Sequence, residues 1–202
     1  MDTITKPEPQ TRKRNQEALD FLLSRQSGII MQEPAPNDDE LNVIFDVGLR
    51  APDHAMLRPW RFVIIRGDAR SAYADLLVEA QRQREGQMTD EMAERLRGKI
   101  VKVPLIIAVG AKIKTDCPIP EIEQLLSAGA ATMNMLNAIH ASGYAAKWVT
   151  GGGAYDRSVN EALGFTFPDR LVGLLFVGSP PAVVRPTPRA ARADHVREWH
   201  GK

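Results

Sequence analysis

The amino-acid sequence predicts a single α+β domain in which helices flank a mostly antiparallel sheet. Four short apolar segments with the composition of buried strands are separated by segments of helical periodicity. The chain shows no internal repeat and no linker. Its 202 residues suit one domain with ample length for a hydrophobic core.

The first half of the chain contains residues that mark the ends of predicted helices. Asn37 and Glu40 have the spacing of a capping box, which predicts the start of a helix, and Pro52 is expected to stop that helix. Residues 60–66 read as a buried strand. Asp68 can cap the helix that follows.

The second half alternates polar and apolar segments. Residues 82–99 mix both charge signs and predict a solvated helical excursion. Residues 104–110 are continuously apolar, so we expect a central strand there. Strands are also predicted at residues 145–150 and 171–178, with a short helix at residues 156–163 between them.

The segment that begins at Pro120 predicts the strongest helix. One apolar stripe contains Ile122, Leu125, Leu126, Gly129, Met133, Leu136 and His140. Small residues at 128–131 would allow another backbone to approach closely. A helix that is apolar around so much of its circumference is expected to be buried on more than one side, and a subunit interface would explain this. His140 reads as a helix-end histidine rather than a ligand.

The composition narrows the classes of function. Hydrophobic residues make up 44% of the chain, charged residues 25%, and the formal net charge is +1, as in an ordinary globular protein. With no basic stripe that carries aromatic residues, we expect no nucleic-acid partner. A single cysteine, Cys117, excludes an internal disulfide and a paired-cysteine site, and we expect no metal site.

The start of the chain is basic but has no apolar stretch of the kind that a secretory signal needs. No run in the sequence is long enough to span a bilayer. We therefore expect residues 1–15 to form a disordered tail on a cytoplasmic protein without a membrane partner. Residues 16–202 are expected to form the single domain.

Two segments carry candidate binding chemistry. Residues 50–60 (Arg-Ala-Pro-Asp-His-Ala-Met-Leu-Arg-Pro-Trp) form a stiff, cationic and aromatic connection between a predicted helix and a predicted strand, a common place for binding residues. A connector with solvated charges is the alternative. Upstream, Arg25 continues the helical stripe of Ala18, Phe21 and Leu22, where a cation is locally inconsistent. A last-turn arginine that complements the helix dipole is the alternative there.

A third segment, residues 151–153, consists of three glycines. No Lys-Ser/Thr pair follows, so this is not a P-loop, and the spacing does not match GxGxxG. A flexible turn, or a close approach of the backbone to a flat ligand, both remain possible here.

Taken together, Arg-x-Ser after the first helix, then Arg-Ala-Pro and later Pro-Trp-Arg-Phe before a strand, resemble the FMN-dependent nitroreductase family. The match is to its small branch with Arg-Ala-Pro-Asp-His, and it extends from about Ala18 to Pro180. The resemblance implies a nitroreductase-like fold and a domain-sharing homodimer with one FMN in each of two interface sites.

The resemblance also assigns roles to residues. It implies that Arg25, Gln26 and Ser27 bind the flavin phosphate, a dianion that needs arginine forks and hydroxyl donors. It places Arg50 and His54 at the flavin from the neighbouring subunit. The strand-end segment against the flavin matches Trp148, Val149 and Thr150, and the basic residue of the family's C-terminal tail matches Arg189 loosely.

The resemblance implies a ping-pong oxidoreductase, in which NAD(P)H and a nitroaromatic or quinone-like acceptor take turns at one flavin, while the cofactor carries the chemistry. Reductive dehalogenation, biosynthetic dehydrogenation and a non-catalytic flavin-binding or redox-sensing role are the alternatives. Arg58 stands where relatives commonly have Gln, and it could shift the choice of acceptor. Residues 82–99 are expected to face that acceptor.

Overall fold

The computed structural model describes residues 14–183 and 186–201. The expected tail therefore lies outside the described residues except for its last two, and one of these, Asn15, caps the first helix. The elements along the chain are α1 (Gln16–Ser24), α2 (Asp38–Gly48), the short helix η1 (His54–Met56), β1 (Trp60–Arg66), α3 (Ala69–Glu85), α4 (Asp90–Val101), β2 (Leu105–Ala111), α5 (Glu121–Ala141), β3 (Ala145–Val149), α6 (Gly152–Tyr155), α7 (Arg157–Ala162), β4 (Arg170–Gly178) and η2 (Arg192–Asp194).

The four strands form one antiparallel sheet in the order β1-β2-β4-β3. Every residue of β2 is buried, as its continuous apolar run predicts for a central strand. β1 and β3 are the outer strands. The predicted α+β class with an antiparallel sheet is confirmed.

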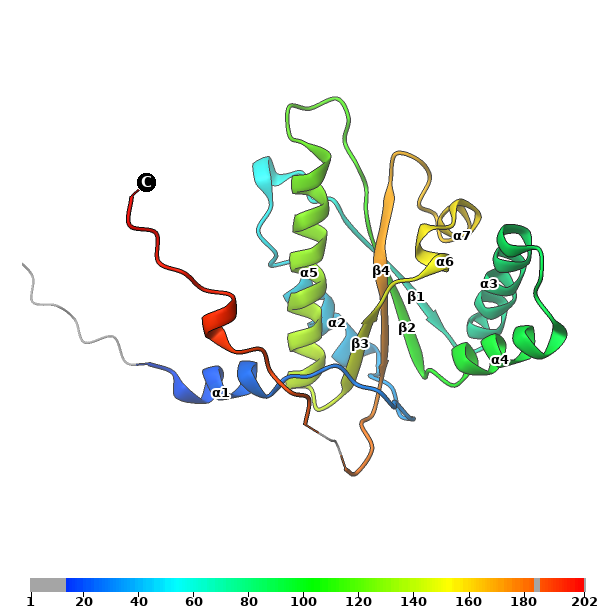
Figure 1. Cartoon of the computed structure of the whole chain (residues 1–202), viewed down its shortest axis with the longest axis horizontal. Coiled ribbons are helices and arrows are strands. Elements are labelled where there is room, and N and C mark those ends of the chain that lie inside the picture. The colour runs from blue at the N-terminus through cyan, green and yellow to red at the C-terminus, as the bar shows by residue number, and fades with distance from the viewer. Residues whose placement is uncertain (1–13, 184–185, 202) are drawn as a thin grey trace, which may run out of the picture.

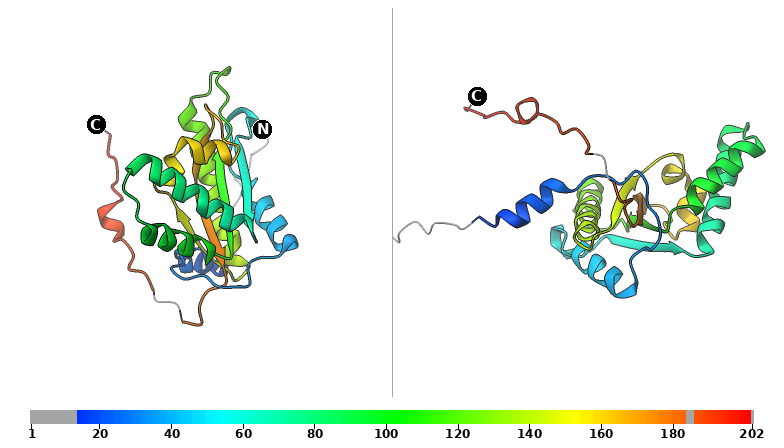
Figure 2. Two further views of the ribbon diagram at one scale, coloured as in Figure 1. Left: turned by 90° about the vertical axis from the view of Figure 1, so that its right-hand side faces the viewer. Right: turned by 90° about the horizontal axis from the view of Figure 1, so that it is seen from below.

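Helices cover both faces of this sheet (Figure 1). Successive side chains of β2 alternate between two hydrophobic clusters, as the period of a strand requires. Ile106 and Ala108 pack with residues of α3, α4 and α7, whereas Leu105, Ile107 and Val109 pack with α2 and α5. Turning the view by a quarter shows α3 and α4 stacked over the face that α5 does not cover (Figure 2).

Of the two predicted helix caps, the one at α2 forms as expected and the one at α3 does not. The capping box at α2 forms in full, because the Asn37 side chain accepts from Glu40 N–H and the Glu40 carboxylate accepts from Asn37 N–H. Asp68 occupies the N-cap of α3, but its side chain makes no capping hydrogen bond. α2 also ends at Gly48, before Pro52 is reached.

The predicted apolar stripe of α5 is not one buried face, because Leu136 is the only one of its seven members that is buried in a single chain. The side that α5 turns to the sheet contains Gln124, Ser127, Ala128, Ala131, Thr132, Met135, Leu136, Ala138 and Ile139. Ile122, Leu126 and Met133 are instead 58%, 65% and 40% exposed. The small residues allow α5 to lie close to the sheet, and the larger apolar side chains face outward.

The three glycines lie at the turn from β3 into α6. Gly151 has φ 148°, a backbone conformation that favours glycine, and it lies directly before α6. Gly152 and Gly153 belong to this short helix. The glycine segment therefore turns the chain sharply from the end of β3 into α6.

α1 and residues 186–201 form two arms that leave the body on the α5 side (Figures 1 and 2). No residue of α1 is buried. Leu22 and Leu23 are 50% and 74% exposed. The arms therefore carry apolar side chains that are exposed in a single chain.

Candidate functional site

The segment after α1 lies along the outer strand of the sheet. Gly28 N–H donates a 2.8 Å hydrogen bond to Ala146 O of β3. Arg25, Gln26 and Ser27 directly precede this bond, and Trp148 lies two residues beyond Ala146 on the same strand. The structure thus brings two of the predicted groups of site residues to one edge of the sheet.

The C-terminal arm meets the same place. The Arg189 guanidinium donates from Nη2 to Arg25 O at 2.7 Å. Thr187 N–H donates to Gln26 Oε1 at 2.9 Å. Arg189, 164 residues from Arg25 in sequence, therefore lies beside the Arg25–Ser27 segment.

The local charge at this corner is positive. Across residues 14–183 and 186–201, no ion pair engages the guanidinium of Arg25 or of Arg189. Burial and then the charge of Arg25 lower the pKa of nearby His140 below its usual value. Two arginines that have no carboxylate partner among the described residues, and an exposed serine hydroxyl, are the donor set that a phosphate group requires.

His140 joins the end of α5 to the end of α1. Its ring stacks on Phe21 with a centroid separation of 4.9 Å. Its Nε2 lies 2.9 Å from Ser24 Oγ. The predicted helix-end histidine is therefore satisfied by hydrogen bonding, as expected.

Trp148 packs across the sheet next to the same strand end. A β-carbon added to Gly173 of β4 would lie 2.2 Å from Trp148 Nε1, so only glycine leaves room for the indole there. The ring also lies near Gly129 of α5. Trp148 remains 38% exposed, and Thr150 beyond it is exposed as well.

His54 lies at the opposite end of α5, and Arg50 lies four residues before it on the loop from α2. His54 Nδ1 is 2.6 Å from a carboxylate oxygen of Glu123, in the first turn of α5. Glu123 and His140 are seventeen residues apart on this helix, and a rise of 1.5 Å per residue separates them by about 25 Å. One chain therefore does not bring His54 and Arg25 to a common small ligand.

The loop that carries Arg50 and His54 is tightly constrained. Ala55, Met56 and Arg58 have φ values of 54°, 53° and 50°, in the left-handed region. Such residues cost of the order of 1–3 kcal/mol each and occur preferentially at functional sites. Asp53 holds the turn by accepting a 2.7 Å hydrogen bond from Arg58 N–H.

A buried serine fixes the same loop against α5. Trp60 Nε1–H donates to Ser127 Oγ at 2.8 Å, and the Ser127 hydroxyl donates to Pro52 O at 2.7 Å. The sequence analysis missed Ser127, Asp53 and Glu123 as supports of this loop. A polar serine on the inner face of an apolar helix is a signal that could have indicated the first of them.

A cavity of about 390 Å³ lies where the polar excursion meets the end of β3. Val149 and Thr150 line it together with Arg84 and Lys99. The stretch expected to face the acceptor therefore lies next to two of the residues expected to contact the flavin. Asp156 binds Arg84 at 3.3 Å, which holds this wall in place.

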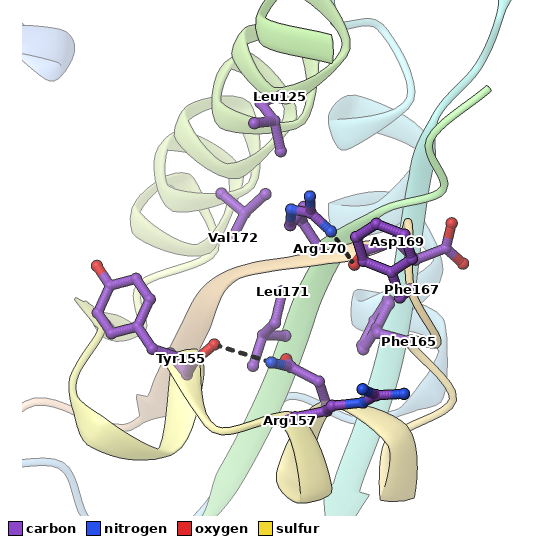
Figure 3. Close-up of a pocket in the computed structure, with 11 residues that line it drawn as sticks. Leu125, Tyr155, Arg157, Phe165, Phe167, Asp169, Arg170, Leu171 and Val172 are labelled. Atoms are coloured by element: carbon purple, nitrogen blue, oxygen red, sulfur yellow. Dashed lines mark hydrogen bonds between the residues drawn. The ribbon is translucent and has the colours of Figure 1, made fainter. Parts of the chain in front are cut away.

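A larger cavity of about 540 Å³ opens between α5, the start of β4 and the helices α6 and α7 (Figure 3). Tyr155, Phe165 and Phe167 give it an aromatic lining. Arg170 crosses its rim 5.2 Å from the Phe167 ring centroid and pairs with Glu121 at 2.9 Å. None of the predicted site residues lines this cavity.

The described part of the chain contains neither a metal-binding cluster nor a membrane-spanning helix. No cluster of three or more histidine, cysteine, aspartate or glutamate side chains in it could hold a metal ion. No helix in the same residues is long and apolar enough to cross a membrane.

Comparison with known proteins identifies the family to which this fold belongs. A sequence profile of the Nitroreductase family matches residues 31–179, most of the chain. The chain belongs to the nitroreductase family. The family match excludes Arg25, Gln26, Ser27 and Arg189, which lie outside its bounds.

Individual proteins similar to this nitroreductase-family chain in sequence or in fold carry names of the same family. A protein of Escherichia coli strain K12 that bears the name "Putative NAD(P)H nitroreductase YdjA" is 35% identical over 164 residues, covering 81% of this chain and 88% of that protein. A nitroreductase-like family protein from Bacillus cereus superimposes with a TM-score of 0.77 at 20% identity, covering 91% and 96%. A nitroreductase with bound FMN from Bacteroides fragilis gives a TM-score of 0.69 at 18% identity, covering 91% and 99%.

Proposed function

We propose that this protein is an FMN-dependent oxidoreductase that takes hydride from NAD(P)H and reduces nitroaromatic or quinone-like acceptors. The observation that carries the proposal is the meeting of Arg25, Ser27 and Arg189 beside the edge strand β3. Among the described residues, neither arginine has an acidic ion-pair partner. The name of the Escherichia coli relative supports NAD(P)H as the reductant.

The residues present fit a phosphorylated flavin. Two guanidinium groups and a hydroxyl suit the phosphate, and Gln26 keeps this corner attached to the C-terminal arm. From there, β3 leads to Trp148, Val149 and Thr150, along which a flat ring system would lie. FMN, when bound, supplies the hydride-accepting chemistry, and the chain binds and orients it.

We further propose that each site is shared by two subunits. His54 lies at one end of α5, and Arg25 lies at the other. A two-fold axis that crosses α5 near its middle would bring the two ends of neighbouring helices together. The outward stripe of Ile122, Leu126 and Met133 is the apolar surface that such an axis would bury.

In this arrangement each group of residues has a separate task. The Arg25 and Ser27 corner anchors the phosphate, and Arg50 and His54 of the second subunit contribute cationic and hydrogen-bonding groups at the ring. A positive group at the ring edge that becomes anionic on reduction stabilises the reduced form. The whole of residues 16–202 acts as one domain, and we place the enzyme in the cytoplasm.

An anaerobic titration tests the proposed activity. The FMN-loaded protein is titrated with NADH and, separately, with NADPH while its visible flavin absorption is recorded. We expect at least one nucleotide to abolish this absorption and a nitroaromatic or a quinone to restore it. FMN binding with no reduction by either nucleotide would instead indicate a non-catalytic flavin protein.

Arg25→Ala is expected to weaken FMN binding by about 1.5–3 kcal/mol, the scale of a charge-assisted hydrogen bond. The free energy of unfolding should change little, because the Arg25 guanidinium has no ion-pair partner among the described residues. Fluorescence titration of the apoprotein with FMN and urea unfolding measure the two quantities. Arg95→Ala, at an exposed position of α4, is the matched control.

The alternative assignment of Arg25 predicts the reverse pattern. If Arg25 only complements the dipole of α1, its removal lowers stability and leaves FMN affinity unchanged. That outcome would make Arg25 a structural residue.

A further inference from the structure

We propose that His140 is a positioning residue for the cofactor phosphate, acting by fixing the end of α1 and therefore Arg25 and Ser27. The inference rests on the proposed function and extends it to a residue to which the family resemblance assigned no role. His140 itself is not placed in contact with the cofactor. It acts through Ser24, the residue that directly precedes Arg25.

The hydrogen bonding at Ser24 assigns the direction of this contact. The single hydroxyl proton of Ser24 is donated to Phe21 O at 2.7 Å. Ser24 Oγ therefore accepts from His140, and the proton on the ring lies on Nε2. Since burial and the charge of Arg25 lower the pKa of His140, the ring provides this donor while neutral at neutral pH.

The contact with His140 strongly affects the position of α1 because α1 makes few other contacts with its own subunit. No residue of α1 is buried, and its apolar side chains Leu19, Leu22 and Leu23 are all exposed. Phe21 stacks on the His140 ring, and Ser24 bonds to it. These two contacts lie on one side of the helix end and hold it against the last turn of α5.

The other side of the same corner is held by the C-terminal arm. Arg189 donates to Arg25 O, so the main chain at Arg25 lies between two fixed points, His140 before it and Arg189 behind it. A shift of the α1 end would displace the Arg25 guanidinium and, to a smaller extent, the Ser27 hydroxyl, because Gly28 N–H is bonded to Ala146 O of β3. A displacement of about 1 Å is enough to impair a preorganised polar site.

The test compares FMN with riboflavin, which lacks only the phosphate. Affinities of both ligands are measured by fluorescence titration of the apoprotein. We expect His140→Leu, which keeps apolar bulk but has no donor, to weaken FMN binding about three- to tenfold, the effect of one net hydrogen bond. Riboflavin affinity should stay within about twofold of wild type because the phosphate corner does not contribute to it. His140→Gln, which restores an N–H donor, should recover most of the preference for FMN.

Two further variants separate positioning from general damage. Ser24→Ala removes the acceptor, and the double variant Ser24→Ala/His140→Leu should be no weaker than the weaker single variant, because both act through one contact. Ser142→Ala removes a hydroxyl at the same end of α5 that bonds only within the helix, to Ala138 O, and should leave both affinities unchanged. If His140→Leu does not fold, Ser24→Ala gives the same readout.

The outcomes are distinguishable. An unchanged FMN-to-riboflavin preference in His140→Leu or Ser24→Ala, or an equal loss for both ligands, overturns the role of His140. A wild-type protein that binds riboflavin as well as FMN, or binds neither, contradicts the phosphate site itself and with it the proposed function.

Discussion

Dimers reassembled from equal amounts of Arg25→Ala and Arg50→Ala chains are expected to regain roughly a quarter of the wild-type sites, although neither variant is active alone. The reason is the geometry of α5, which separates Arg25 from His54, on the loop that follows Arg50, within one chain. In a mixed dimer, one site contains both substitutions and the other contains neither. Random pairing makes about half of the dimers mixed, so about one site in four is intact.

The experiment unfolds and refolds the two variants together and then measures flavin content and turnover. Each variant refolded alone is the control and should stay inactive. A tagged chain shows that subunits exchange. Confirmed exchange without recovered activity would mean that Arg25 and Arg50 do not serve the same site from different subunits.

Leu126→Glu is expected to abolish the dimer and, with it, most FMN binding. Leu126 lies on the outward stripe of α5 and is 65% exposed in one chain, so the substitution is tolerated in the monomer. In the proposed two-fold interface the new carboxylate would be buried among apolar side chains without a partner, and each unpaired buried charge costs several kcal/mol. Because the proposed site needs both subunits, loss of the dimer removes Arg50 and His54 from the flavin.

Analytical ultracentrifugation and FMN titration measure both effects. Met92→Glu is the matched control, since Met92 is 45% exposed on α4, away from α5. It should leave mass and FMN affinity unchanged. A monomeric Leu126→Glu protein that binds FMN normally would contradict the shared site.

Much of the fold could be predicted from local sequence signals. A continuous apolar run predicted the central strand β2, because a strand covered on both faces has no polar side. A buried strand was also predicted at residues 60–66, but β1 is an outer strand in which only Trp60 and Ile65 are buried. The Asn37 and Glu40 pair predicted the start of α2 because its two capping hydrogen bonds are made within four consecutive residues.

Other features depend on distant contacts and could not be read in this way. Apolar periodicity did not indicate which face of α5 packs against the sheet, because small residues such as Ala128 and Ala131 lie there and Leu126 lies outside. Propensity also gives no warning of left-handed conformations at Met56 and Arg58, which Asp53 and the contacts with α5 enforce.

The candidate site was predicted only as separate fragments. Local pattern and family resemblance indicated Arg25 and Arg189, but only the folded chain places them 2.7 Å apart through the Arg25 carbonyl. His140 carried no signal beyond its place near a helix end. Its role depends on a contact with Ser24, which lies 116 residues away in sequence.

The central claim is that FMN binds across two subunits, and native mass spectrometry of the FMN-reconstituted protein tests it most directly. The account predicts one dominant species, a dimer of two chains with two FMN molecules. Apoprotein reconstituted with riboflavin should retain far less ligand under the same conditions. An FMN-loaded monomer, or a protein that takes up no FMN at all, would contradict the account.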